Sequence, residues 1–273
     1  MLPLTEFSNT LVLVTGATGA VGPCVVHALN QEGFRIRTFS ADAPAPGMLP
    51  EKVEVVIGDV TDMGAIQAAM QGVDAVVHMA ALLHIVNPTE AMYEKYERVN
   101  VGGTRAVVEA AISAGVKRIV LFSTIAIYGA SNGKVLSEMS PVHPDTIYAR
   151  TKLAAERIFM SAKDTDGQPL GVVLRLGAVY GSRIKGNYEQ LVHALARHRF
   201  VPIGNGLNRR TLVYDEDVGQ AAVLAVTHPA AAGRIFNVTD GCFHTLKEII
   251  KSICAALGRE TPQGSADGLY NLF

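Results

Sequence analysis

The sequence lacks any surplus of basic residues, because 24 Lys and Arg stand against 25 Asp and Glu in 273 residues, a formal net charge of -1. Such a balance gives no patch that would attract nucleic acid or an anionic membrane, so we predict neither partner. The chain also lacks an apolar run near the roughly 18 residues that span a bilayer. No charged N-terminal region precedes an apolar stretch and a cleavage site, which favours a protein that stays in the cytoplasm.

Cysteine is scarce as well. Cys24, Cys242 and Cys254 are scattered, without CxxC or Cys/His spacing. This pattern argues against a disulfide framework and a zinc site, and it is typical of a reducing compartment. The histidines show no ligand spacing either, so we predict no metal.

What the chain does contain is a regular alternation of short β-branched runs and amphipathic stretches. The strand candidates are continuously apolar, which indicates a parallel sheet covered on both faces. They are residues 10–16, 34–40, 53–59, 74–80, 117–123 and 171–177, and the helices expected between them are 21–32, 62–70, 89–114 and 147–162. We therefore predict an α/β fold, a doubly wound parallel (Rossmann) sheet whose ligands bind beyond the carboxyl ends of the strands.

After about residue 178 the pattern changes to helices at 188–198, 217–228 and 245–257 with short strands at 211–214 and 234–238. We predict a dinucleotide-binding domain at 1–178 and a smaller C-terminal substrate lobe at 179–273, either consecutive or interleaved. The tail after Gly258 has weak periodicity, which is typical of a partly disordered end.

The first expected strand runs into TGATGAVG, which places Gly16, Gly19 and Gly22 before a helix. Glycines here allow a tight turn and a close approach of the backbone to a pyrophosphate, whose charge the helix N-terminus favours. The G-x-x-G-x-x-G spacing differs from G-x-G-x-x-G, but its place at the first strand-to-helix turn predicts dinucleotide binding.

The end of the second strand leaves the dinucleotide open. It reads FSAD, so Ser40 stands where an acidic residue would bind the ribose 2′-hydroxyl of NAD. Asp42 is a candidate for that hydroxyl, and Arg37 is a candidate for the 2′-phosphate of NADP. After the third strand, Asp59 and Val60 are expected to flank the adenine, with a helix cap as the alternative role of Asp59.

Seven motifs occur in order: TGATGAVG (15–22), GDVTD (58–62), HMAA (78–81), RVNVGGT (98–104), FSTIAIYG (122–129), YARTK (148–152) and LRLGAVYG (174–181). Together they resemble the extended short-chain dehydrogenase/reductase family, and specifically its NAD-dependent nucleotide-sugar epimerases and dehydratases. The resemblance extends over about residues 10–258, since RRTLVYDEDV and FNVTDG also fit. The ordered set is far more specific than any one motif.

The resemblance implies that Tyr148 is the catalytic acid/base, that Lys152 is its partner, and that Thr124 holds the reacting oxygen. It also implies cofactor contacts for Tyr148, Lys152 and a larger set of residues near the carboxyl ends of the strands: Gly16, Thr18, Gly19, Ala20, Val21, Gly22, Ser40, Asp59, Val60, Met79, Ala80, Ala81, Asn100 and Ser123. The implied cofactor is NAD, with NADP open.

In the C-terminal lobe the resemblance implies that Arg210 contacts a substrate diphosphate, with Asn187 and Arg183 as weaker candidates. The lobe is short, so some substrate contacts of longer members are either missing or supplied by another chain. By analogy with the family, the two long helices at 89–114 and 147–162 would pair two copies into a homodimer.

The chemistry needs these residue types. A tyrosine hydroxyl has a pKa near 10 and is a poor base at neutral pH. An ammonium group nearby, together with the positive nicotinamide of an oxidised cofactor, would lower that pKa, and the i,i+4 spacing puts Lys152 on the same helix face as Tyr148. Thr124 would hydrogen-bond the same substrate oxygen and so position the proton transfer.

Two other polar groups receive structural interpretations. His78 ends a strand and is interpreted as a packed, hydrogen-bonded histidine rather than a catalyst. Asp215, Glu216 and Asp217 begin a helix, where their charge favours the helix dipole.

Three functions stay open. The leading hypothesis is an NAD(P)-dependent epimerase that oxidises the C4 hydroxyl of a nucleotide-linked sugar and returns the hydride to the other face. The second is an NADP-dependent reductase or dehydrogenase of a small or steroid-like carbonyl or alcohol, suggested by the missing acidic residue at Ser40. The third is a dinucleotide-sensing protein without turnover, against which the three reactive side chains argue. Dehydration is disfavoured, because Ile125 and Ala126 rather than acidic residues follow Thr124.

Overall fold

The computed structural model describes residues 8–83, 89–202 and 204–262. The chain divides into two compact units: unit 1 comprises Met1–Leu176 and Asp215–Val238, and unit 2 comprises Gly177–Tyr214 and Thr239–Phe273. Within the described ranges, no helix combines the length and the apolar character that a bilayer crossing requires. Most of the tail after Gly258, from residue 263 on, lies outside these ranges.

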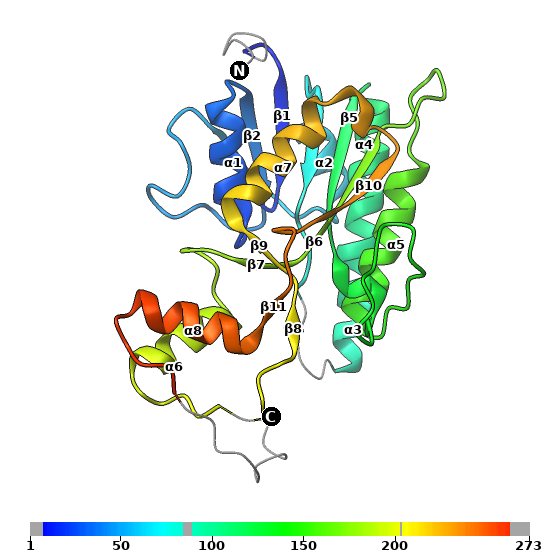
Figure 1. Cartoon of the computed structure of the whole chain (residues 1–273). Coiled ribbons are helices and arrows are strands. Elements are labelled where there is room, and N and C mark those ends of the chain that lie inside the picture. Colours follow the sequence, from blue (N-terminus) through cyan, green and yellow to red (C-terminus); the bar gives the residue numbers. More distant parts are fainter. Residues whose placement is uncertain (1–7, 84–88, 203, 263–273) are drawn as a thin grey trace. The chain divides into compact units, whose positions relative to one another are not determined.

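A seven-stranded parallel sheet forms the centre of unit 1 (Figure 1), which confirms the predicted doubly wound α/β fold. The spatial order of the strands is β10-β6-β5-β4-β1-β2-β3. Because β2 and β4 lie on opposite sides of β1, the order reverses between β1 and β4, the place where such sheets bind ligands. The strands are β1 (Leu11–Thr15), β2 (Arg35–Ser40), β3 (Glu54–Ile57), β4 (Ala75–His78), β5 (Arg118–Thr124), β6 (Gly171–Leu176) and β10 (Arg234–Val238).

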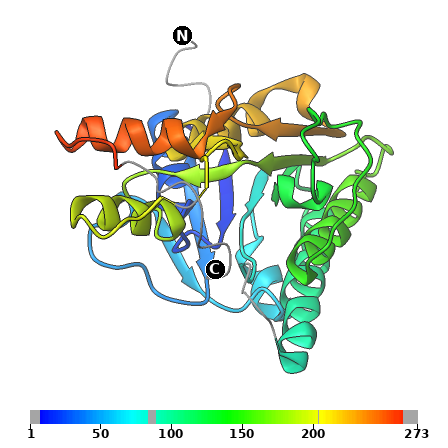
Figure 2. The same ribbon diagram turned by 60° about the horizontal axis from the view of Figure 1, so that its bottom comes forward.

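Helices cover both faces of this sheet, as the continuously apolar strands require (Figures 1 and 2). On one face α1 (Gly22–Gln31) packs against α7 (Asp215–Thr227), and on the other α4 (Thr104–Ser113) packs against both α2 (Met63–Ala69) and α5 (Ile147–Ser161). A short 3-10 helix, η2 (Ile125–Tyr128), follows β5.

The predicted helix at 89–114 consists of three consecutive segments: α3 (Glu90–Tyr96), a π-helical segment η1 (Glu97–Gly103), and α4. Asn100 and Gly103 are buried in η1. Gly103 has no room for a side chain, since an added Cβ would lie 2.7 Å from Cγ2 of Val60. Widened turns of this kind occur often at functional sites.

Residues 215–238 return to unit 1, which differs from the contiguous ranges 1–178 and 179–273 and makes the two units interleaved. β10 pairs with β6 over five residues, and α7 lies so close to α1 that an added Cβ at Gly219 would be 3.0 Å from the Cβ of Ala28. Periodicity identified this helix and strand, but it does not say which sheet edge a strand joins.

Unit 2 contains α6 (Asn187–Ala196) and α8 (Leu246–Ala256), which pack through Leu195, Ile250 and Cys254. Two small sheets accompany them, one pairing β7 with β9 in parallel and one pairing β8 with β11 in antiparallel fashion. Three of these strands were not predicted, because two or three residues show no period. The strands are β7 (Ala178–Tyr180), β8 (Arg209–Arg210), β9 (Leu212–Tyr214) and β11 (His244–Thr245).

His78, at the end of β4, is enclosed in unit 1. Its ring stacks on Phe159 with centroids 5.8 Å apart, and its Nδ1 and Nε2 bond the hydroxyls of Thr15 (2.6 Å) and Thr104 (3.1 Å). Burial, and secondarily the Lys152 ammonium, lower the pKa of His78 from 6.5 to about 3. The predicted role as a packed histidine is confirmed.

A first prediction concerns the packing of β6 on α5. An added Cβ at Gly171 would lie 2.2 Å from the carbonyl oxygen of Phe159, so the backbone would have to move. Gly171→Ala should lower the free energy of unfolding in urea by about 1–3 kcal/mol. Gly64→Ala on α2 is the matched control, because its Cβ would meet only Asp62 Oδ1 at 3.4 Å and alanine favours a helix. Equal stability of the two variants would contradict this packing.

A second prediction concerns acid stability. The unfolded chain protonates His78 below about pH 6.5 and the folded chain only near pH 3, so stability present above pH 6.5 is lost as the pH falls toward 3. At about pH 5 this loss should reach about 2 kcal/mol. His78→Gln should remove that part of the pH dependence in urea unfolding, whereas the exposed control His27→Gln should keep it. A His78→Gln variant with the parental pH slope would refute the assignment.

Candidate active site

The glycine loop follows β1 where the strand order reverses. Gly16 has a φ of +74°, and an added Cβ there would lie 2.7 Å from the backbone nitrogen of Ala80. At Gly22, the first residue of α1, an added Cβ would lie 2.1 Å from the carbonyl oxygen of Ala17. Only glycine fits these two positions, because the loop packs directly on the segment after β4 and on itself.

The start of α1 is suited to an anion. The helix has Val21 at its N-cap, no side chain that caps its first N–H groups, and no acidic residue in its first turn. The dipole of a helix N-terminus favours phosphate, and Thr18, Gly19 and Ala20 before this helix are partly or fully exposed, but the Gly22 N–H already donates to the Gly19 carbonyl oxygen (3.1 Å) and Pro23 has no N–H. At the end of β2, Ser40 Oγ is a buried polar atom without a hydrogen-bond partner in the described part of the chain. These features fit a dinucleotide.

Arg37 does not fit the role of a 2′-phosphate ligand. Its Nη1 donates to the carbonyl oxygens of Ala69 (2.8 Å) and Gln71 (2.7 Å), and its Nε lies 2.9 Å from Oε1 of Glu54. Arg37 is therefore not available to bind the 2′-phosphate of NADP. Asp42, the other candidate at this strand end, is exposed.

Asp59 and Val60 have different surroundings. Asp59 is exposed, and its Oδ1 accepts the N–H of Thr61 (2.9 Å) in the turn before α2. The cap of α2 is Asp62 rather than Asp59. The side chain of Val60 is buried in the core against Gly103, so only its backbone is left to contact a ligand.

Asn100, buried in η1, links the segment after β4 to α5. Its Oδ1 accepts the N–H of Leu82 (2.7 Å), and its Nδ2 donates to Leu82 O (3.2 Å) and to Thr151 Oγ1 (3.1 Å). The Thr104 hydroxyl in turn donates to the carbonyl oxygen of Asn100 (2.5 Å). The linked segment includes three predicted cofactor residues, all partly exposed: Met79, Ala80 and Ala81.

Helix α5 presents Tyr148, Lys152 and Glu156 at i, i+4 and i+8, and therefore on one face. It packs against β5, which ends in Thr124, and against η2. Thr124 Oγ1 accepts the N–H of Ala126 (3.1 Å), which leaves the hydroxyl hydrogen to donate to another oxygen. The fold thus brings the sequence-predicted tyrosine, lysine and threonine onto two packed elements of unit 1.

Burial dominates the electrostatics of this face. It lowers the pKa of Lys152 to about 8, against the opposing effect of the Glu156 carboxylate. Burial, and then Tyr96, raise the pKa of Tyr148 to about 12. The expected lowering of this pKa involves the lysine and an oxidised cofactor together, whereas the raised value belongs to the chain by itself. A lowering would depend on the positive charge of an oxidised cofactor.

Two charged residues that were not predicted lie next to this face. Arg175 on β6 forms an ion pair with Glu156, with Nη2 2.7 Å from Oε2, and both are buried. Ser123, for which a cofactor contact is predicted, donates its hydroxyl to Glu156 (2.5 Å). The sequence signal that could have revealed this ion pair is an arginine within an apolar strand, because a buried charge requires a partner.

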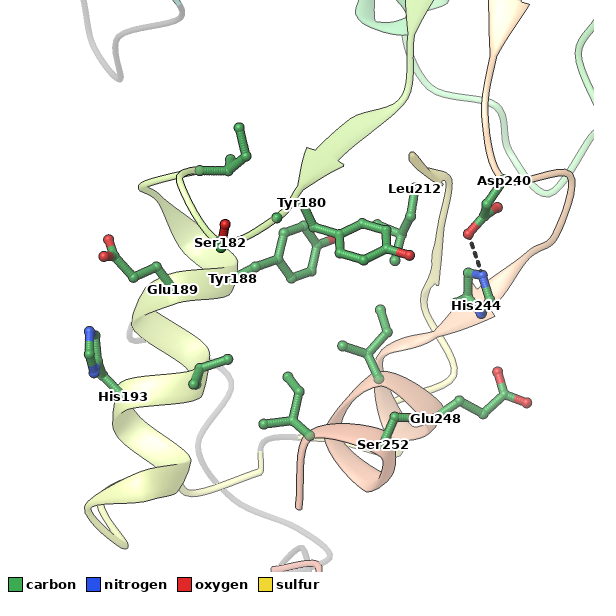
Figure 3. A pocket seen from close by; sticks show the side chains of 15 residues that line it. Tyr180, Ser182, Tyr188, Glu189, His193, Leu212, Asp240, His244, Glu248 and Ser252 are labelled. Carbon is green, nitrogen blue, oxygen red and sulfur yellow. Dashed lines mark hydrogen bonds and ion pairs between the residues drawn. The ribbon is translucent and has the colours of Figure 1, made fainter. Parts of the chain in front are cut away.

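Unit 2 contains a pocket of about 630 Å³ lined by β7, α6, β11 and α8, among other residues (Figure 3). Tyr180 and Tyr188 contribute aromatic rings, and His244 Nε2 lies 2.7 Å from Oδ2 of Asp240. The residues that line it include no lysine and no arginine.

The predicted substrate residues other than Thr124 belong to unit 2 and are exposed: Arg183, Asn187 and Arg210. None of the three lines the pocket. Arg210 nevertheless pairs in β-register with His244, which does, and its charge opposes the rise that burial causes in the pKa of Tyr188. The guanidinium is therefore within electrostatic reach of the pocket.

Comparison with known proteins also indicates a protein that binds a dinucleotide. The NAD dependent epimerase/dehydratase family matches residues 12–239. A UDP-glucose 4-epimerase of Vibrio cholerae is 28% identical over 260 residues, 92% of this chain and 77% of the relative. A 3 beta-hydroxysteroid dehydrogenase/Delta 5→4-isomerase of Mycobacterium tuberculosis is 28% identical over 270 residues, 94% of this chain and 72% of the relative.

The chain is shorter than its curated relatives. It spans only 59% of an uncharacterized protein of Sinorhizobium fredii to which it is 28% identical over 242 residues, 88% of this chain. Among solved structures, the Bordetella bronchiseptica enzyme WbmG in complex with NAD and UDP is 27% identical, with a TM-score of 0.80 over 98% of this chain and 84% of that one. The match over most of the sequence, with the parallel sheet and the glycine loop, shows that the chain belongs to the NAD-dependent epimerase/dehydratase family, of the extended short-chain dehydrogenase/reductase type, whose cofactor is NAD.

Proposed function

We propose that this chain is an NAD-dependent epimerase of a nucleotide-diphosphate sugar, which oxidises the C4 hydroxyl to a ketone and returns the hydride to the other face. The observation that carries the proposal is the buried lysine one helical turn from Tyr148, on a helix packed against the strand that ends in Thr124. These three side chains are the ones an alcohol oxidation needs.

NAD, when bound, supplies the acceptor and donor of the hydride. Gly16, Gly19 and Gly22 with the start of α1 would hold it. Tyr148 takes the proton of the C4 hydroxyl during oxidation and returns it when the ketone is reduced. Lys152, mostly charged below about pH 8, stabilises the phenolate form of the tyrosine. Thr124 donates its hydroxyl hydrogen to the same substrate oxygen and fixes its position.

The substrate class is supported by unit 2. A nucleotide sugar carries a planar base and a diphosphate, and the lobe offers tyrosine rings in its pocket and the exposed Arg210 within electrostatic reach of them. Arginine is well suited to bind phosphate oxygens. WbmG, which is similar to this chain, is described in complex with UDP.

A second candidate is a dehydrogenase of a steroid-like alcohol or carbonyl. The observation that favours it is the pocket wall, which includes Leu212, Ile249 and Ile253 and neither lysine nor arginine. The hydroxysteroid dehydrogenase relative is as similar to this chain as the sugar epimerase, at 28% identity. Such an enzyme would reduce or oxidise its dinucleotide in net amount, whereas an epimerase recycles it.

The deciding experiment incubates the purified chain, with bound NAD verified by mass spectrometry, with UDP-glucose, UDP-galactose and their N-acetyl forms. Interconversion without net NADH is the expected result. If none of these sugars is interconverted, the proposed substrates are excluded. Net NADH formation with a steroid alcohol would establish the second candidate. A protein that binds NAD and turns over neither class would be a sensor.

A third prediction concerns the acid/base. Tyr148→Phe should reduce turnover by about 10²-fold or more while it leaves NAD binding nearly unchanged, since the ring remains and the proton acceptor is lost. Tyr93→Phe, the same change at an exposed position of α3, should behave as the parent. Near-normal turnover of Tyr148→Phe would remove the tyrosine from the mechanism.

A fourth prediction concerns the diphosphate. Arg210→Met should raise the KM for a nucleotide sugar by roughly 10- to 100-fold with a smaller effect on kcat, the size expected for a lost hydrogen bond between charged groups. Arg209→Met is the control, because neighbouring strand residues point to opposite faces. If both variants raise KM equally, Arg210 makes no specific contact.

A further inference from the structure

The ion pair of Glu156 and Arg175 is not used by any step above, although it lies one helical turn beyond Lys152. Arg175 Nε lies 3.1 Å from Oε1 and 3.2 Å from Oε2 of the carboxylate, and Nη2 lies 2.7 Å from Oε2. The hydroxyl of Ser123 also donates to Oε1 (2.5 Å). The carboxylate is therefore held in a bidentate arrangement with a further donor, a strong and oriented form of ion pair.

The arginine is held in turn by three other segments of unit 1. Its Nη1 donates to the hydroxyl of Tyr128 (2.8 Å), and its guanidinium carbon lies 5.0 Å from the centre of that ring. The Tyr128 hydroxyl donates to Oδ1 of Asn237 (2.8 Å), whose backbone N–H donates to Oε1 of Glu138 (2.7 Å). Residues of η2, β10 and the loop before α5 thus fix the arginine, so it has little freedom to leave the glutamate.

Stability alone does not explain such a pair, because well-packed apolar side chains of similar volume often stabilise a fold as much or more. The position of the pair suggests another role. Lys152 is 4% exposed, and a buried ammonium without a negative partner tends to lose its proton. The Glu156 carboxylate, four residues later on the same face, is the group that opposes this loss.

The surroundings of Lys152 leave this role to Glu156. The titratable groups of unit 1 that face this region from α3, α5, β4 and β6 are Tyr96, Tyr148, Glu156, His78 and Arg175. Glu156 carries the negative charge among them, since His78 stays neutral and burial keeps the Tyr148 phenol protonated. The charged residues of α3, η1 and α4 with described side chains are exposed: Glu94, Lys95, Glu97, Arg98, Arg105 and Glu109.

Arg175 completes the arrangement. A buried carboxylate beside a buried ammonium could take its proton, which would leave both groups neutral. A guanidinium remains charged in proteins and stabilises the carboxylate form of Glu156 through two nitrogens. The positive charge of the arginine would thus stabilise the carboxylate form of the glutamate, and the carboxylate would stabilise the ammonium form of the lysine.

We propose that Glu156 and Arg175 are positioning residues of the active site: Arg175 keeps Glu156 a carboxylate, and Glu156 keeps Lys152 an ammonium on the face that carries Tyr148. This inference rests on the proposed role of Lys152, but its effect on the lysine is measurable without substrate.

The test follows the lysine side chains of the full chain by NMR with ¹³Cε-labelled lysine over a pH titration, with Lys152 identified by the signal missing in Lys152→Met. In Glu156→Gln the titration midpoint of Lys152 should fall by about one pH unit or more. Glu156→Asp, which restores the charge, should bring it back toward the parental value. Glu54→Gln, the same change at the exposed partner of Arg37, should leave it unchanged.

A second variant covers the case in which Glu156→Gln leaves Arg175 unpaired and fails to fold. Glu156→Gln combined with Arg175→Met removes both charges, and its Lys152 midpoint should also lie below that of the parent. A parental midpoint in either folded variant would overturn the inference. If nucleotide sugars are turned over, the basic limb of the kcat/KM profile should shift to lower pH in the same variants. Absence of turnover in the parent would refute the proposed function and leave the NMR result standing.

Discussion

The burial of charge between the sheet and α5 is the constraint on which the reactive face depends. Lys152, Glu156 and Arg175 are each nearly inaccessible to solvent, so their charges need partners within the protein. The strand positions of Arg175 and Ser123 and the helical spacing of Glu156 satisfy this requirement through direct hydrogen bonds. A surface lysine in a YxxxK sequence would need none of these partners, which is why the motif by itself says little about chemistry.

Close backbone approach is the second physical theme of unit 1. Gly16 against Ala80 brings the loop after β1 to the segment after β4, and Gly103 against Val60 brings the π-helical turn to the segment after β3, at distances that any side chain would prevent. Asn100 then joins the segment after β4 to α5 by side-chain bonds. The backbone at the carboxyl ends of the strands is thereby fixed independently of a ligand, as a preorganised dinucleotide site requires.

The residues proposed for cofactor binding and proton transfer belong to unit 1, and those proposed for the nucleotide part of the substrate belong to unit 2. The sheet, the glycine loop and the reactive face of α5 belong to unit 1, and the chain is 28% identical both to a sugar epimerase and to a hydroxysteroid dehydrogenase. Under the proposed function, substrate choice would depend on unit 2, which offers an exposed arginine for a phosphate and a largely apolar pocket for a ring system. Fold resemblance alone cannot separate these activities, because function resides in the side chains of the site.

Local patterns in the sequence determined the six leading strands, the glycine turn before α1, and the shared face of Tyr148 and Lys152, since each depends on neighbours within one or two turns or on one strand. Contacts between distant residues were decided only by the tertiary structure. It paired β10 with β6, committed Arg37 to Glu54, buried the side chain of Val60, and joined Glu156 to Arg175, 19 residues away. It also raised the pKa of Tyr148 through burial, which the spacing of the motif does not show. The physical reason is the same in each case: periodicity reports which side of an element is buried, whereas solvation and charge depend on what buries it.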